Sequence, residues 1–170
     1  LKEVKQHLGD VEKFLGKRLG DKKNPLLLSV RSGARESMPG MMDTILNLGL
    51  NDSVVEGLAD LTGNTLFAYD SYRRFIQMYA NVVYNVSGHY FEDLLDIIKQ
   101  DNDVSHDSDL SAEDMKRIVV EFKKIFEKHT GKEFPQDTHS QLTDAIRAVL
   151  DSWMCSRAIT YRKLNGISAE

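Results

Sequence analysis

Apolar residues recur at helical spacing along most of the chain, and this pattern predicts a mainly helical protein. In the second half of the chain, for example, Ile118, Phe122 and Phe126 trace one helical face. The stretch after residue 64 is too densely apolar for a single stripe, so we expect that helix to be buried on more than one side. The predicted helices cover about residues 2–15, 53–61, 64–86, 90–99, 112–130 and 138–164.

Capping residues mark several of these boundaries. Asp52 or Ser53 is the predicted N-cap of the second helix, and Gly63 is its predicted C-cap. Ser111 has the same N-terminal role for the fifth helix, which Gly131 should end.

One segment departs from the helical pattern. The apolar run from Leu26 to Val30 lies between turn signals and predicts a short buried strand, which ends at Arg31. A loop follows, and we expect a short helix over about residues 44–50, closed by Gly49 and Asn51. The predicted fold class is therefore mainly α with a small β element (α+β).

The loop after the strand carries the residues most suited to binding an anion. Arg31 and Arg35 bracket its first turn, and Gly40 opens the second. Small and turn-forming residues allow backbone N–H groups to approach a ligand closely. A helix N-terminus near residues 42–44 would add a favourable dipole. The pattern indicates a site for a polyphosphate, although glycine-containing turns of this kind often bind nothing.

The same loop residues have structural interpretations. Arg31 could form a salt bridge with one of the 26 acidic residues, and Arg35 could brace the loop against Glu36 or Asp43. Three methionines in the loop could line a nucleotide pocket, although methionine more often fills gaps in a core. They are Met38, Met41 and Met42.

Composition narrows the function classes. The chain has 170 residues, a formal net charge of -4, 41% hydrophobic and 28% charged residues. These values are typical of a globular domain and argue against a dedicated nucleic-acid surface. No apolar run is long enough to span a bilayer, so we expect no membrane partner. Cys155, the single cysteine, excludes an internal disulfide and is expected to be a small buried apolar residue.

Two further clusters of charged residues favour structural roles. Asp70 and Arg74 lie four residues apart on a helix, which predicts an internal ion pair. The acidic segment 101–109 has the alternating oxygens of a calcium loop, but His106 stands where glycine is needed and Ala112 where a glutamate belongs. We expect a solvated loop there. Since the five histidines show no metal-binding spacing, the sequence predicts no metal ligand.

Longer stretches of the sequence are more specific than these patterns. In this order along the chain, they closely resemble the pyruvate phosphate dikinase family. The resemblance begins at about residue 20 and extends to the end of the chain. The stretches are Val30-Arg31-Ser32-Gly33-Ala34-Arg35, Ser37-Met38-Pro39-Gly40-Met41-Met42-Asp43-Thr44, Asn47-Leu48-Gly49-Leu50-Asn51-Asp52, residues 69–79, Glu133-Phe134-Pro135-Gln136, Ser152-Trp153 and residues 157–165.

The resemblance implies a place for this chain within a longer protein. Family members are several times longer, and the chain is similar to an internal part of their N-terminal, ATP-grasp-like nucleotide-binding domain. Residues 1–52 would then be part of the nucleotide-binding lobe with its phosphate loop. Residues 53–170 would be a helical subdomain and a return helix of the same domain.

The resemblance also implies site residues. The arginine that matches Arg31 is the ligand of the ATP phosphates in the family, so Arg31 is the predicted catalytic residue. Residues 37–44 match the lid over the phosphates, in which Gly40 and the Met41 amide are the expected contacts. Arg31, Arg35, Gly40, Met41, Asp43 and Thr44 form the predicted nucleotide-binding set.

The implied reaction converts ATP, phosphate and pyruvate into AMP, pyrophosphate and phosphoenolpyruvate. A histidine on another domain of the same parent chain carries the phosphoryl groups, and its motif does not occur in this sequence. Mg²⁺ is the implied metal cofactor, with ligands mainly outside this chain. The resemblance further implies a homodimeric parent that is cytoplasmic, or organellar in some family members, and a chain that is inactive alone.

Two alternatives stay open. The first is a dikinase similar to phosphoenolpyruvate synthase, from which residues 38–43 depart. The second, from a different class, is a non-catalytic helical interaction module that keeps the loop without using it. An enzyme lobe should leave Arg31, Gly40 and the following helix N-terminus facing one open concavity, whereas an interaction module would bury or pair them.

Overall fold

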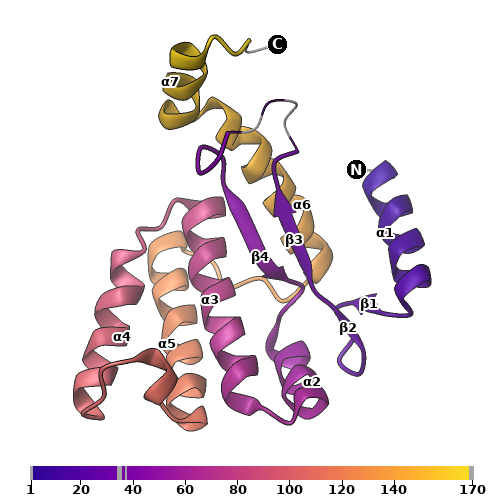
Figure 1. Ribbon diagram of the computed structural model, residues 1–170. Helices are drawn as coiled ribbons and strands as arrows, with labels where there is room; N and C mark the ends of the chain where they lie inside the picture. Colours follow the sequence, from indigo (N-terminus) through magenta and orange to yellow (C-terminus); the bar gives the residue numbers. More distant parts are fainter. Residues whose placement is uncertain (1, 34–35, 37, 169–170) are drawn as a thin grey trace.

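A β-hairpin stands at the centre of the fold and is flanked by helices (Figure 1). The computed structural model describes residues 2–33, 36 and 38–168. Strands β3 (Leu28–Arg31) and β4 (Thr44–Leu48) pair antiparallel, and a second, minimal sheet joins β1 (Arg18–Leu19) to β2 (Pro25–Leu26) in parallel. Among the described residues no helix is both long and apolar enough to cross a membrane.

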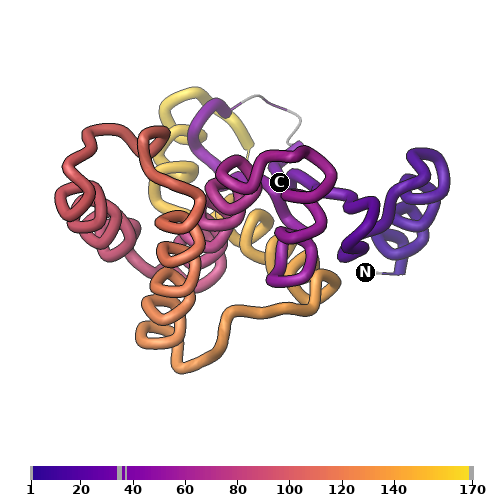
Figure 2. Tube along the Cα trace, turned by 90° about the horizontal axis from the view of Figure 1, so that it is seen from below, coloured from indigo at the N-terminus to yellow at the C-terminus, as the bar shows by residue number. Residues whose placement is uncertain are grey.

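The described part of the chain contains seven α-helices, of which α3 and α6 pack against the hairpin. Helix α3 packs against α2, α5, α6 and β4, which confirms that it is buried on more than one side. Seen from below, α1 lies on the opposite side of the hairpin from α4 and α5 (Figure 2). The helices are α1 (Lys2–Leu15), α2 (Asp52–Thr62), α3 (Thr65–Tyr84), α4 (His89–Asp101), α5 (Ala112–Thr130), α6 (Thr138–Asp151) and α7 (Ser156–Asn165).

Aromatic rings fill the core between α3, α5 and the segment before α6. The ring of Phe134 meets those of Tyr72, Phe75, Tyr79 and Phe126 edge to face, with centroids 5.3 to 6.1 Å apart. Such edge-to-face pairs add to the free energy gained from burying the rings. The Phe134 segment is thereby fixed against α3, and with it the start of α6.

The expected short helix over residues 44–50 is wrong, because this segment is β4. Ile45 and Leu48 are both fully buried although they lie three residues apart, a spacing that is also found in helices. The pairing with β3 shifts register between Leu28 and Val30, and Asn47 has a φ of 57°. A β-bulge inserts one extra residue and so changes which face the next side chain meets. Two core residues three apart are therefore compatible with a strand here.

The last predicted helix is also interrupted. Helix α6 ends at Asp151, a 3-10 turn, η2 (Ser152–Met154), follows, and α7 begins at Ser156 after the extended Cys155. The chain changes direction at this point (Figure 1). Leu150 is 67% exposed, and Cys155, which we expected to be buried, is only partly buried.

Most predicted boundaries are confirmed. Ser111 caps α5 in a capping box with Asp114, and Gly63 and Gly131 end their helices in the left-handed conformation. The predicted cap of α2 is wrong by one residue or more. Asn51 is the N-cap, and its side-chain oxygen accepts hydrogen bonds from the amides of residues 53 and 54.

Candidate functional site

The loop end of the hairpin, which we call the tip, presents Arg31. This residue is the last of β3 and pairs with Thr44, the first of β4. Both side chains are exposed. The strands therefore deliver a guanidinium to the edge of the sheet where the loop begins. Ala34, Arg35 and Ser37 of the loop lie outside the described residues.

A cleft of about 970 Å³ opens beside the tip. One wall comes from the end of β3 and the loop, and includes Arg31 and Met42. A second wall comes from α6, η2 and the end of α7, where apolar side chains dominate. The remaining lining residues are Val30, Ser32, Gly33, Glu36, Ile146, Val149, Leu150, Trp153, Asn165, Gly166, Ile167 and Ser168.

Arg31 brings positive charge into this cleft. Its guanidinium makes no ion pair with a carboxylate of the residues that the structure describes. Arginine keeps its charge in proteins and offers several donors in a planar fork. The internal salt bridge considered for Arg31 is therefore not seen in the described part of the chain, and the side chain is available to an anion.

The other predicted contacts lie differently. Gly40, Met41, Asp43 and Thr44 do not line the cleft. The Met41 amide donates a hydrogen bond to the Met38 carbonyl at 3.1 Å, which closes a turn. Gly40 lies within that turn with a φ of 71°, a conformation that glycine adopts without strain. The structure thus brings Arg31 and Met42 together at the cleft, and places Gly40, Met41, Asp43 and Thr44 around the tip.

The expected helix N-terminus after the loop is wrong, since a strand occupies residues 44–48. A strand carries little net dipole, so the dipole of a following helix contributes nothing at this site. Among the described residues, an anion in the cleft would therefore be bound by Arg31 and by polar groups near it.

A set of contacts that the sequence did not predict holds the tip. The Arg157 Nε donates to the Met41 carbonyl at 3.0 Å, and the same guanidinium pairs with the Asp43 carboxylate. The Asp43 amide donates to the Ser152 Oγ at 3.1 Å. We call Met41, Asp43, Ser152 and Arg157 the tip brace. Ser152 and Arg157 belong to the stretches that resemble the dikinase family, which is the signal that could have drawn attention to them.

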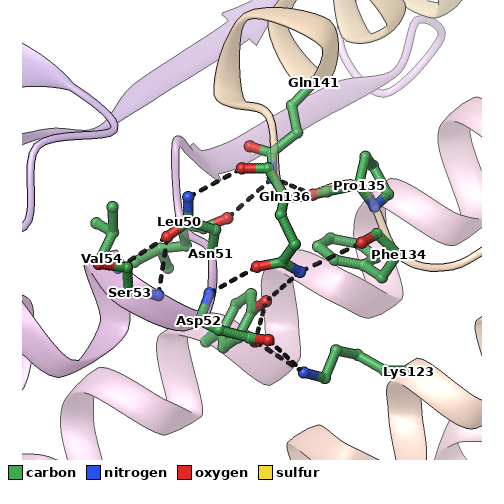
Figure 3. Close-up of polar contacts among 11 residues, drawn as sticks. Leu50, Asn51, Asp52, Ser53, Val54, Lys123, Phe134, Pro135, Gln136 and Gln141 are labelled. Carbon is green, nitrogen blue, oxygen red and sulfur yellow. Dashed lines mark hydrogen bonds and ion pairs between the residues drawn. The ribbon is translucent and has the colours of Figure 1, made fainter.

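The opposite end of the hairpin is held by polar contacts, of which the one between Gln141 and Leu50 is buried (Figure 3). The Gln141 side chain donates to the carbonyls of Leu50 and Pro135 at 3.0 and 2.8 Å. Gln136 accepts from the Asp52 amide at 2.9 Å, and its carbonyl accepts from Asn51. We call the whole set the base network; it consists of Leu50, Asn51, Asp52, Tyr72, Lys123, Pro135, Gln136 and Gln141.

Asp52 joins this network to the helices. Its carboxylate accepts hydrogen bonds from the Tyr72 hydroxyl at 2.9 Å and from Lys123 at 2.7 and 2.8 Å. Burial, together with the nearby Asp52 charge, raises the pKa of Tyr72 well above its ordinary value. Tyr72 therefore stays protonated and acts as a donor.

The predicted Asp70–Arg74 ion pair is confirmed, with Arg74 Nε 2.8 Å from the Asp70 carboxylate. Arg73, 4% exposed, also pairs with Asp70 and reaches Asp107 in the 3-10 turn η1 (Asp107–Asp109). Although partial burial of Asp107 raises the pKa of its carboxyl, the neighbouring Arg73 and Lys99 more than offset this and lower the pKa. These contacts attach the acidic segment to α3 and α4.

Comparison with known proteins gives the chain its family. The profile described as "Pyruvate phosphate dikinase, AMP/ATP-binding domain" matches residues 1–170. The chain is 54% identical over 161 residues to pyruvate, phosphate dikinase of Clostridium symbiosum, which is 94% of this chain and 18% of that protein. It is 52% identical over 166 residues to the chloroplastic enzyme of Mesembryanthemum crystallinum, which is 98% of this chain and 17% of that protein.

A relative from Giardia intestinalis, also named pyruvate, phosphate dikinase, is 52% identical over 163 residues, covering 96% of this chain and 18% of that protein. The chain thus spans less than a fifth of the length of these relatives. On the match over its whole length, the chain belongs to the family of pyruvate phosphate dikinase AMP/ATP-binding domains.

Proposed function

We propose that Arg31 binds the phosphates of ATP in the cleft beside the tip. The observation that carries this proposal is an exposed guanidinium at a strand end, lining a cleft of about 970 Å³ without a carboxylate partner among the described residues. A guanidinium fork forms charge-assisted, bidentate hydrogen bonds with phosphate oxygens. Membership of an AMP/ATP-binding family supports the same assignment.

The cleft suits a nucleotide in its chemistry as well as its size. It combines the Arg31 charge with apolar side chains from α6 and η2, such as Val149 and Trp153. Binding sites for small molecules are typically apolar with a few well-placed polar groups. Gly40, Met41, Asp43 and Thr44 would hold the loop around the phosphates, and Arg35, outside the described residues, is proposed as a second cation.

Within a complete dikinase, this segment would help to present ATP for phosphoryl transfer to a histidine on another domain of the same protein. The overall reaction would convert ATP, phosphate and pyruvate into AMP, pyrophosphate and phosphoenolpyruvate. Arg31 would act by positioning the phosphates and by neutralising charge that develops during transfer. The chain alone would not complete this reaction.

Mg²⁺ would be held mainly by residues beyond this chain. Among the described residues that line the cleft, Glu36 is the sole carboxylate, and one carboxylate does not make a magnesium site. The metal would lessen the charge of the triphosphate. The role of the present residues is to bind and orient the nucleotide.

The structure supports the enzyme interpretation over a helical interaction module at one of three points. Arg31 faces an open cleft, whereas an interaction module would bury or pair it. Gly40 does not line that cleft, and the element directly after the loop is strand β4 and not a helix. Because Arg31 is the group that would contact phosphate, we give its position the most weight and favour the enzyme interpretation.

Isothermal titration of Mg-ATP tests the proposal in the longer dikinase polypeptide and in this chain. Arg31→Ala should weaken binding by about 1 to 3 kcal/mol, the range for losing a hydrogen bond to a charged group. Arg117→Ala, on the exposed face of α5, is the matched control and should leave binding unchanged. Equal affinity of Arg31→Ala and the unsubstituted protein would assign Arg31 a purely structural role.

A further inference from the structure

The tip of the hairpin is attached to the corner where α6 turns into α7. Arg157, in the first turn of α7, contacts the loop at two points: the Met41 carbonyl, at 3.0 Å from Nε, and the Asp43 carboxylate. The planar guanidinium can donate in both directions at once. A single side chain therefore fixes two loop residues relative to α7.

Ser152 fixes the same loop from the other side of the corner. Its hydroxyl accepts a hydrogen bond from the Asp43 amide at 3.1 Å and donates one to the Val149 carbonyl at 2.6 Å. Ser152 is 5% exposed, so these bonds are shielded from water. Asp43 is consequently held through its backbone by Ser152 and through its side chain by Arg157.

The corner that holds the tip is also a wall of the cleft. Trp153, next to Ser152, lines the same cleft as Arg31. The Arg162 guanidinium lies 4.1 Å from the centre of the Trp153 ring and donates to the Trp153 carbonyl at 2.6 Å. Arg162 itself is 4% exposed. The wall is thus tied firmly to α7, from which Arg157 extends to the loop.

We propose that Arg157 and Ser152 are positioning residues for the nucleotide cleft. By linking the loop to the α6–α7 corner, they set the distance between the Arg31 wall and the Trp153 wall. Neither residue lines the cleft itself, so each would act on it only through this link. This inference rests on the proposed function, because its effect on binding requires that ATP occupies the cleft.

The alternative is that the tip brace only adds stability. The Arg157 and Asp43 side chains are 52% and 28% exposed, and exposed ion pairs contribute little to the free energy of folding. A contact that changes stability little can still restrict a loop, so the two roles separate experimentally. Local hydrogen exchange reports loop restriction without any nucleotide.

The first experiment measures hydrogen–deuterium exchange in the ligand-free protein. Arg157→Ala should raise the exchange rate of the amides of residues 41–44 by about threefold to fivefold, equivalent to losing one exposed charge-assisted contact. Exchange within α5 should stay unchanged, which excludes general loosening. Unchanged exchange at residues 41–44 would overturn the inference whether or not ATP binds.

The second experiment measures the Kd of Mg-ATP in the longer dikinase polypeptide. Arg157→Ala should raise Kd by about threefold to fivefold, and Arg157→Lys, which keeps the charge, should recover part of that loss. In an Asp43→Ala background, Arg157→Ala should have a much smaller effect, since its main partner is gone.

The two proposals fail in different ways. If Arg31→Ala weakens ATP binding and Arg157→Ala does not, Arg157 is not a positioning residue and the proposed function stands. If neither substitution changes Kd while exchange at residues 41–44 rises, the tip brace is real but the cleft is not the ATP site. Additive effects of Asp43→Ala and Arg157→Ala would show that the residues act separately, which also contradicts the inference.

Discussion

The two ends of one hairpin are held in different ways. At the base, the fully buried Gln141 donates to two carbonyls, and the buried Tyr72 donates to Asp52, whose own side chain is 54% exposed (Figure 3). At the tip, the ion pair of Arg157 and Asp43 is partly exposed, and Arg31 has no carboxylate partner in the described part of the chain. Buried polar groups are costly to leave unpaired, whereas exposed ones can bind water. The buried contacts of Gln141 are therefore suited to stability, and the exposed Arg31 is suited to exchanging partners.

Removing Gln141 should break the base most severely. Gln141→Leu leaves the buried Leu50 carbonyl and the partly buried Pro135 carbonyl without their donor, so we expect a loss of about 2 to 4 kcal/mol in the free energy of unfolding. Urea denaturation measures the change. Gln100→Leu, at an exposed position on α4, is the matched control. A change as small as that of the control would mean that the Gln141 contacts contribute nothing to the base.

Tyr72→Phe should have a smaller effect at the same end. It removes the hydroxyl that donates to Asp52, which keeps Lys123 as a partner, so the expected loss is about 1 kcal/mol. Tyr90→Phe provides a control at a more exposed site. Equal effects of the two tyrosine substitutions on urea denaturation would mean that the Tyr72 hydroxyl adds no stability at the base.

The same tyrosine makes the base sensitive to alkali. Since burial raises the pKa of Tyr72 in the folded chain, its contribution is complete below the unfolded pKa of about 10 and is lost as pH rises above it. Unfolding free energies measured between neutral pH and pH 11 should therefore fall steeply above pH 10. Tyr72→Phe should make the decline shallower, with buried Tyr79 responsible for part of the remainder. An identical decline in the variant would refute this assignment.

Substitution at the tip brace should cost little stability. For Arg157→Ala we expect a loss of about 0.2 to 1 kcal/mol in the free energy of unfolding, the range for exposed ion pairs. Thermal denaturation alongside Arg117→Ala measures it. If Arg157→Ala lowered the free energy of unfolding as much as Gln141→Leu, the tip brace would contribute as much stability as Gln141, and the contrast between the two ends would be wrong.

Arg31→Ala should have the smallest effect on stability, within about 0.5 kcal/mol, because the side chain is exposed. Its effect on Mg-ATP binding should nevertheless be the largest of the tip substitutions. A clear drop in the unfolding midpoint with unchanged binding would reverse both expectations and would indicate a structural role.

The helices and their ends could be predicted from the sequence because their signals are local. Capping by Ser111 and Gly131 depends on neighbouring residues alone. Strand β4 was missed because a bulge places Ile45 and Leu48 three residues apart in the core, a spacing also found in helices. A bulge depends on the pairing partner, which the local sequence does not contain.

The candidate site was predictable in part for the same reason. Arg31 stands at the end of a recognisable strand, so its exposure at a loop followed from the pattern. The cleft could not be predicted in this way, because its second wall comes from residues 146–168, more than a hundred positions away. The pairing of Asp43 with Arg157 likewise joins residues 114 apart, and no local rule selects one arginine from the many available.

The large sequence separations at both ends of the hairpin bear on how the chain folds. In the base network, Gln136 and Gln141 contact residues 50–52 at separations of 84 to 91 positions, and the tip brace joins residues 109 to 116 positions apart. Contacts this distant along the chain carry a high loop-closure entropy and form slowly. We therefore expect the helices between residues 65 and 130 to assemble first. The hairpin would then be fixed at both ends in a late folding step, which the fluorescence of Trp153 would report.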